Sequence, residues 1–140
     1  MDEPNAEDQL IAAARAAATR AYAPYSSFAV GCAVESFAGE VAVGANVENA
    51  CTRLGLCAEQ AALAAAQVAF GLDQVARIVM VALNGDAPVT PCGGCRQAIL
   101  EAAELSGRDI EIICVGTSAT LRTTISALLP HAFTAERIKR

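Results

Sequence analysis

The sequence predicts an α/β fold in which helices cover a mixed central sheet. Segments with helical spacing alternate with short apolar runs in the order helix, strand, strand, helix, strand, helix, strand. The 140 residues suit a single domain over 1–140, and 54% of them are hydrophobic, which is enough for a sizeable core. Apart from an alanine bias, no repeat, long linker or low-complexity segment divides the chain.

The first half of the chain is predicted to contain two helices with a hairpin between them. Residues 6–21 predict an amphipathic helix, because small apolar side chains recur there at helical spacing. The runs 28–37 and 40–47 are rich in Val and Ala and flank a short turn, which predicts two paired strands. Residues 57–70 have high helix propensity throughout, and Gly71 is expected to end this helix.

The second half continues the alternation of strand and helix. Residues 75–83 form an apolar run short enough for a buried strand. A second long helix is expected to open at 91–95 and to run to about residue 105, followed by a strand over 110–115. A last strand over 121–124 and a helical turn over 125–129 complete the expected order.

Charge and composition restrict the classes of function. The net charge of -5 disfavours binding of long nucleic acid, which depends on clustered Lys and Arg, so the expected partner is a small molecule. The acidic N-terminus lacks the pattern of a signal peptide, and Arg15 and Arg20 interrupt the one Ala-rich stretch, so no membrane span is expected. Six cysteines in such a chain are expected to be thiols in a reducing cytoplasm.

Three cysteines and one glutamate carry the predicted chemistry. Cys92 and Cys95 form a Cys-x-x-Cys pair, and Cys57 would be a third thiolate, which leaves the fourth position of a tetrahedral zinc open for water. Both motifs fall at predicted helix N-termini, where the helix dipole favours thiolate. Glu59 follows Cys57 by two residues and would reach the open side of the metal as a proton shuttle. The alternatives are a redox pair, an inert Cys57, and a glutamate that only complements the helix dipole.

Three motifs stand out in the sequence: Asn46-Val47-Glu48-Asn49, Cys57-Ala58-Glu59 and Pro91-Cys92-Gly93-Gly94-Cys95-Arg96-Gln97. Together they resemble the small homotetrameric cytidine deaminases, a family of zinc deaminases, over about residues 22–133. The resemblance implies a three-layer α-β-α sandwich around about five strands and one zinc ion per chain. It also implies pyrimidine salvage: zinc-activated hydroxide attacks C4 of cytidine or 2′-deoxycytidine, Glu59 moves protons to N3 and the amino group, and uridine or 2′-deoxyuridine and ammonia are released.

The resemblance also assigns substrate contacts residue by residue. Asn46 and Glu48 match a pair that binds the ribose hydroxyls, although a polar strand end is the simpler explanation. Phe28 matches an aromatic residue that packs on the pyrimidine, or else it is a core residue at a strand start. Backbone groups expected to contact the base belong to Ala58, Thr90 and Cys92. Phe133 matches a residue that reaches a neighbouring subunit's site, which implies a homotetramer with composite pockets.

Two positions depart from the family pattern. Gln60 stands where an Arg would neutralise ligand sulfurs, so the helix N-termini and Arg96 are expected to compensate. Thr52 stands where many relatives carry Tyr, which puts an intersubunit or ribose-side contact in doubt. These departures leave open a sibling deaminase for an aminoglycosyl-nucleoside antibiotic of the blasticidin type.

The other cysteines and the single histidine are expected to have no part in the metal site. Cys32 and Cys114 lie in predicted strands and Cys51 in a loop, and His131 is expected at the surface or at an interface. A non-catalytic zinc module is a further alternative. It would need a fourth protein ligand, and none is placed to supply it.

Overall fold

The expected mixed sheet of five strands is confirmed by a computed structural model that describes residues 4–139. The strands lie in the order β2-β1-β3-β4-β5, and β3 pairs parallel with β4 while the other pairs are antiparallel. Their bounds are β1 Val30–Ser36, β2 Val41–Ala45, β3 Val75–Ala82, β4 Glu111–Val115 and β5 Thr120–Thr124.

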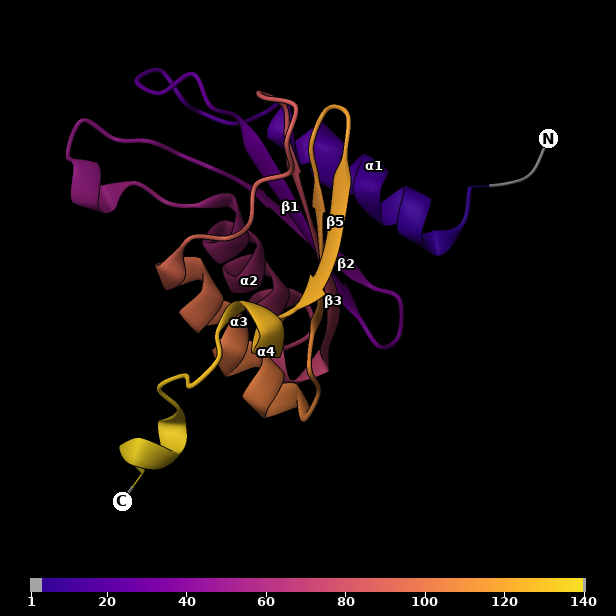
Figure 1. Cartoon of the computed structure of the whole chain (residues 1–140), viewed down its shortest axis with the longest axis vertical. Helices are drawn as coiled ribbons and strands as arrows, with labels where there is room; N and C mark the ends of the chain where they lie inside the picture. Colours follow the sequence, from indigo (N-terminus) through magenta and orange to yellow (C-terminus); the bar gives the residue numbers. More distant parts are fainter. Residues whose placement is uncertain (1–3, 140) are drawn as a thin grey trace.

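Helices cover both faces of this sheet, as Figure 1 shows. Helix α1 (Ala6–Ala18) packs on one face through Leu10 and Ala14. On the other face lie α2 (Ala58–Ala69) and α3 (Gly93–Ser106), followed by the short α4 (Ile125–Leu128). Three 3₁₀ turns, Thr52–Leu54, Leu72–Gln74 and Ala135–Arg137, lie in the connections and near the C-terminus. The arrangement is the expected three-layer α-β-α sandwich.

The first helix ends three residues earlier than its sequence pattern predicts. Thr19 caps it, and the Thr19 hydroxyl donates to the carbonyl of Ala16. The chain then leaves the helix because Tyr22 pairs with the segment after β2: its N–H donates to Asn46 and its carbonyl accepts from Glu48. This pairing places the loop before β1 beside the segment that carries Asn46 and Glu48.

Two glycines allow the helices to approach the sheet closely. A Cβ on Gly31 of β1 would lie 1.9 Å from the Ala14 carbonyl oxygen, and one on Gly44 of β2 would lie 2.4 Å from the Ala62 backbone nitrogen. Any side chain at these positions would overlap helix backbone. Helices α1 and α2 are thereby held in direct backbone contact with the sheet.

The strand directions place the starts of α2 and α3 side by side. Since β1 is antiparallel to both β2 and β3, these two strands run in the same direction, and their carboxyl ends lie at one edge of the sheet. Helix α2 follows β2 and α3 follows β3. Ligands commonly bind at such an edge. Within residues 4–139, no helix is long and apolar enough to cross a membrane.

Candidate active site

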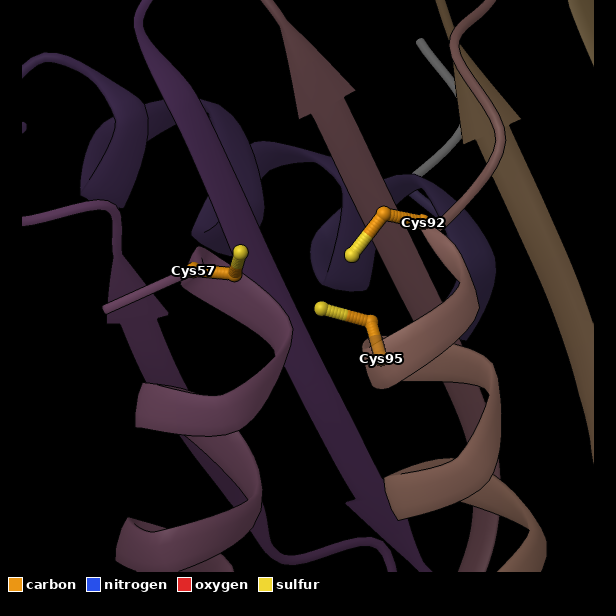
Figure 2. Close-up of side chains that lie close together, drawn as sticks. All are labelled: Cys57, Cys92 and Cys95. Atoms are coloured by element: carbon orange, nitrogen blue, oxygen red, sulfur yellow. The ribbon is translucent and has the colours of Figure 1, made fainter. Parts of the chain in front are cut away.

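Three cysteine sulfurs converge where α2 and α3 begin. Cys57 is the N-cap of α2, Cys92 is the N-cap of α3, and Cys95 lies in the first turn of α3. Their three Sγ atoms lie within 4.8 Å of one another, and Figure 2 shows them pointing into a common space between the two helices. Segments 35 residues apart in the sequence therefore present one sulfur cluster.

The donor set fits a single zinc ion. Tetrahedral zinc with thiolate ligands at about 2.3 Å needs sulfurs about 3.8 Å apart, which small side-chain rotations from the observed cluster can supply. Within the described part of the chain, no other group of three or more Cys, His, Asp or Glu side chains is gathered in this way. Three protein ligands and a fourth open position are typical of catalytic zinc.

The three thiols have different electrostatic environments. Backbone N–H groups at the start of α3, that of Cys95 foremost, lower the pKa of Cys92. Burial raises the pKa of Cys57 and of Cys95, and the nearby charge of Glu59 raises that of Cys95 further. Cys92 is thus the thiol most readily ionised without metal, whereas the other two need a bound cation to favour their thiolates.

Glu59 is buried beside the sulfur cluster. It lies in the first turn of α2 and only 4% of it is exposed. It borders a cavity of about 220 Å³ together with Cys57 and Cys92. A buried carboxylate that lines a pocket beside the sulfur cluster is placed for proton transfer to a bound molecule.

The same cavity brings together most of the predicted base-binding residues. Its walls also include Phe28, Asn46, Ala58 and Thr90. Three apolar residues complete the lining, and their sequence pattern indicated only strand or loop: Val30, Met80 and Val89. No local signal in the sequence could have assigned them, because they reach the cavity through the register of the sheet and the path of the loop before α3.

A second and larger cavity of about 500 Å³ adjoins the first and shares Asn46 and Cys57 with it. Its lining is more polar, and Glu48, Thr52 and Tyr25 belong to it. The site therefore has an inner, partly apolar chamber at the sulfur cluster and an outer, acidic one toward solvent.

Asn46 and Glu48 have protein partners of their own in these chambers. The Asn46 side-chain amide donates to the carbonyl of Phe28 at 2.8 Å and accepts from the N–H of Val30 at 2.9 Å. Glu48 accepts from the backbone N–H groups of Tyr25 and Ser26 and from the Ser26 hydroxyl. The hydroxyl bond is the main reason that the pKa of Glu48 is lowered. Each side chain keeps acceptor capacity for a ligand.

Gln60 and Arg96 have different surroundings. The Gln60 side-chain nitrogen lies 3.7 Å from Cys95 Sγ, a distance that suits an N–H···S hydrogen bond. Arg96 instead donates to the carbonyls of Pro91 and Leu128 and to the Thr90 hydroxyl. Arg96 thus braces the loop that leads into α3, and its hydrogen bonds go to oxygen atoms rather than to the sulfurs.

The remaining predicted residues lie away from the sulfur cluster. Cys32 and Cys114 are buried in β1 and β4, and Cys51 is exposed. His131 is exposed at a positive φ of 53°. Phe133 is 59% exposed, and its carbonyl accepts from the side chain of Gln97 on α3. Phe133 is not among the residues that line either chamber of its own chain.

The fold and the sulfur cluster agree with comparisons to known proteins. Residues 4–106 match the family described as the cytidine and deoxycytidylate deaminase zinc-binding region. The chain belongs to this deaminase family. A cytidine deaminase of Halalkalibacterium halodurans is 43% identical over 117 residues, which cover 83% of this chain and 85% of that one. A probable cytidine deaminase of Dictyostelium discoideum is 35% identical over 92% of this chain and 84% of its own.

Solved structures extend the likeness to three dimensions. The crystal structure of cytidine deaminase from Burkholderia pseudomallei superposes with a TM-score of 0.80 at 40% identity, over 89% of this chain and 97% of that one. The cytidine deaminase from Mycobacterium tuberculosis superposes with a TM-score of 0.75 at 35% identity, over 91% and 97% of the two chains. The shared fold confirms the expected family and architecture.

Replacing the clustered cysteines one at a time should abolish tight zinc binding. Cys57→Ala, Cys92→Ala and Cys95→Ala each remove one of the three clustered sulfurs that are expected to bind zinc. Metal analysis of the purified variants should find well under one zinc per chain. Cys32→Ala, Cys51→Ala and Cys114→Ala are the matched controls and should keep one. Zinc that depended on Cys51 would contradict this ligand set.

Removing the Gln60 donor should weaken zinc binding without abolishing it. Gln60→Leu keeps the approximate volume but loses the N–H that faces Cys95 Sγ. Loss of such a partner of a metal ligand typically costs roughly 10- to 100-fold in affinity. Competition with a chelator measures the zinc dissociation constant, and Gln60→Arg, which restores donors, is the control. Equal affinities of the wild-type and Leu proteins would show that the contact has no influence on the metal.

Proposed function

We propose that this chain is a zinc-dependent cytidine deaminase that converts cytidine and 2′-deoxycytidine to uridine and 2′-deoxyuridine with release of ammonia. The inner chamber is the observation that carries the proposal, because Glu59, Phe28 and two cysteines of the sulfur cluster, Cys57 and Cys92, line one small cavity. Membership of the deaminase family and a relative named cytidine deaminase, 43% identical over 83% of this chain, support it.

The residues of the chain divide the chemistry among them. Cys57, Cys92 and Cys95 would hold zinc, which when bound supplies a Lewis acid that lowers the pKa of a water molecule. The Glu59 carboxylate would accept a proton from the attacking water and pass it to N3 of the base. It would then move the second proton to the amino group at C4, so that the C4–N bond breaks and ammonia leaves.

The inner chamber would orient the base for this attack. The Phe28 ring and the apolar wall around it would pack against the pyrimidine faces. Backbone groups of Ala58, Thr90 and Cys92 would contact its polar edge. Arg96 would act at a distance, since its hydrogen bonds to Pro91 and Thr90 fix the loop that carries those groups.

The outer chamber favours a nucleoside over a nucleotide. Glu48 contributes a carboxylate there, and none of the described residues that line the chamber is Lys or Arg. A 5′-phosphate would meet a negative charge without a counter-cation, whereas sugar hydroxyls can donate to Glu48 and to the free acceptor site of Asn46. A blasticidin-type nucleoside stays an alternative substrate, because the outer chamber measures about 500 Å³ and Thr52 lines it where many relatives carry Tyr.

The proposal includes a homotetramer with composite sites, acting in pyrimidine salvage in the cytoplasm. Phe133 is well exposed and lines neither chamber of its own chain, which is compatible with a place in a neighbour's site. All six cysteines are free thiols, as a reducing compartment would keep them.

Glu59→Gln should separate metal binding from catalysis. The amide keeps the size of the side chain but cannot accept and return a proton, so kcat should fall by at least roughly 10²- to 10⁴-fold. Turnover is measured by the loss of cytidine absorbance and by the release of ammonia. Deoxycytidylate and a blasticidin-type nucleoside are assayed in the same way as alternative substrates. Zinc content should stay near one per chain. Turnover close to that of the wild-type protein would remove Glu59 from the mechanism.

Phe133→Ala should weaken substrate binding by the assembled protein. If the ring covers the nucleoside in a neighbouring site, its loss should raise KM for cytidine by roughly tenfold, with zinc retained. Sedimentation at the assay concentration establishes the oligomeric state in parallel. Ile138→Ala, at another exposed apolar position of the same C-terminal segment, is the control. An unchanged KM in a tetramer would exclude Phe133 from the composite site.

A further inference from the structure

The turn before β1 is held by a side chain from another loop. Ser27 adopts a positive φ of 57°, a conformation that costs a non-glycine residue of order 1 kcal/mol. Glu48 stabilises the turn, because one carboxylate oxygen accepts from the N–H of Tyr25 at 3.0 Å and from that of Ser26 at 3.2 Å. The second oxygen accepts from the Ser26 hydroxyl.

The Ser26 hydroxyl has two simultaneous partners. It donates to Glu48 and accepts from the backbone N–H of Phe28 at 3.0 Å. A hydroxyl has a single proton, so donation to Glu48 leaves its lone pairs free for Phe28. The Phe28 carbonyl is held by Asn46 from the other side. Both backbone polar groups of Phe28 are therefore fixed by side chains rather than by neighbouring strands.

These bonds link the two chambers. Glu48 lines the outer chamber and Phe28 the inner one, and Ser26 lies between them in the hydrogen-bonded chain. An ionised carboxylate offers about four lone-pair sites, and three are occupied by Tyr25 and Ser26. The fourth can accept a sugar hydroxyl without displacing Ser26. A nucleoside could therefore bind Glu48 while the hydrogen bonds from Glu48 through Ser26 to Phe28 stay intact.

We propose that Ser26 is a positioning residue that couples sugar recognition at Glu48 to the placement of the Phe28 ring against the base. This inference rests on the proposed function, since it takes a cytosine nucleoside as the molecule that spans both chambers. Ser26 lines neither chamber and does not belong to the sulfur cluster. It acts on binding through Phe28.

The first test is kinetic and uses the zinc-loaded full chain. Ser26→Ala should raise KM for cytidine by roughly five- to tenfold and change kcat by less than about twofold, because the lost bonds hold the base rather than move protons. Ser26→Thr keeps the hydroxyl and should restore KM. Ser27→Asn is the matched control and should leave KM unchanged. Asn tolerates a positive φ, and this substitution leaves the hydroxyl at position 26 in place. An unchanged KM in Ser26→Ala would overturn the proposal.

A double-mutant cycle then identifies the route of the effect. If Ser26 acts through the ring, Ser26→Ala should raise KM by no more than about twofold when Phe28→Leu is already present. If Ser26 acts only through Glu48 and the sugar, the full effect should persist in that background. Persistence of the full effect would reject the coupling to Phe28.

A spectroscopic readout separates this inference from the proposed function. The chain has four Phe residues, and 4-fluorophenylalanine labels all of them. The ¹⁹F resonance that disappears in Phe28→Leu should shift in Ser26→Ala and return in Ser26→Thr, in zinc-loaded protein without nucleoside. An unmoved resonance would refute the positioning role. A shifted and rescued resonance supports that role even if the wild-type chain fails to deaminate cytidine, which would refute the proposed function alone.

Discussion

The position of β1 between β2 and β3 is the constraint on which the site depends. Antiparallel pairing on both sides makes β2 and β3 run in the same direction, and each is followed by a long helix. The N-termini of α2 and α3 therefore meet, and with them the three sulfurs. Backbone contact at Gly44 limits the movement of α2 relative to the sheet. The three clustered cysteines are thus positioned by backbone packing rather than by long side chains.

The two chambers of the pocket differ in polarity. Apolar side chains and the sulfur cluster surround the inner chamber, where a buried carboxylate is most effective in proton transfer because little water competes with it. Polar groups gather in the outer chamber, where exchange with water keeps their desolvation cost low. A ligand with a flat, polar-edged ring and a hydroxylated tail matches this change from an apolar inner chamber to a polar outer one.

Local sequence patterns predicted the elements and the metal cluster well. Cysteine spacing is a strong signal, since few arrangements other than a metal site place Cys-x-x-Cys and a distant third Cys at two helix starts. The partners of Arg96 could not be predicted, because Leu128 lies 32 residues away and meets it only through the packing of α4 on α3. The early end of α1 also depends on a distant partner, the segment around Asn46 that pairs with Tyr22. Val30 and Met80 reach the cavity through strand register, which composition does not encode.

Asn46 both holds neighbouring segments together through hydrogen bonds and lines the two chambers. Its backbone N–H donates to Val30 and its carbonyl accepts from Tyr22, while its side-chain amide donates to Phe28 and accepts from Val30. Aspartate, though similar in size, would set a carboxylate against the Phe28 carbonyl and lose the donor. Evolution of a new ligand preference in this fold therefore has little freedom at position 46. It must proceed at neighbours such as Thr52, whose side chains can change without dismantling the strand start.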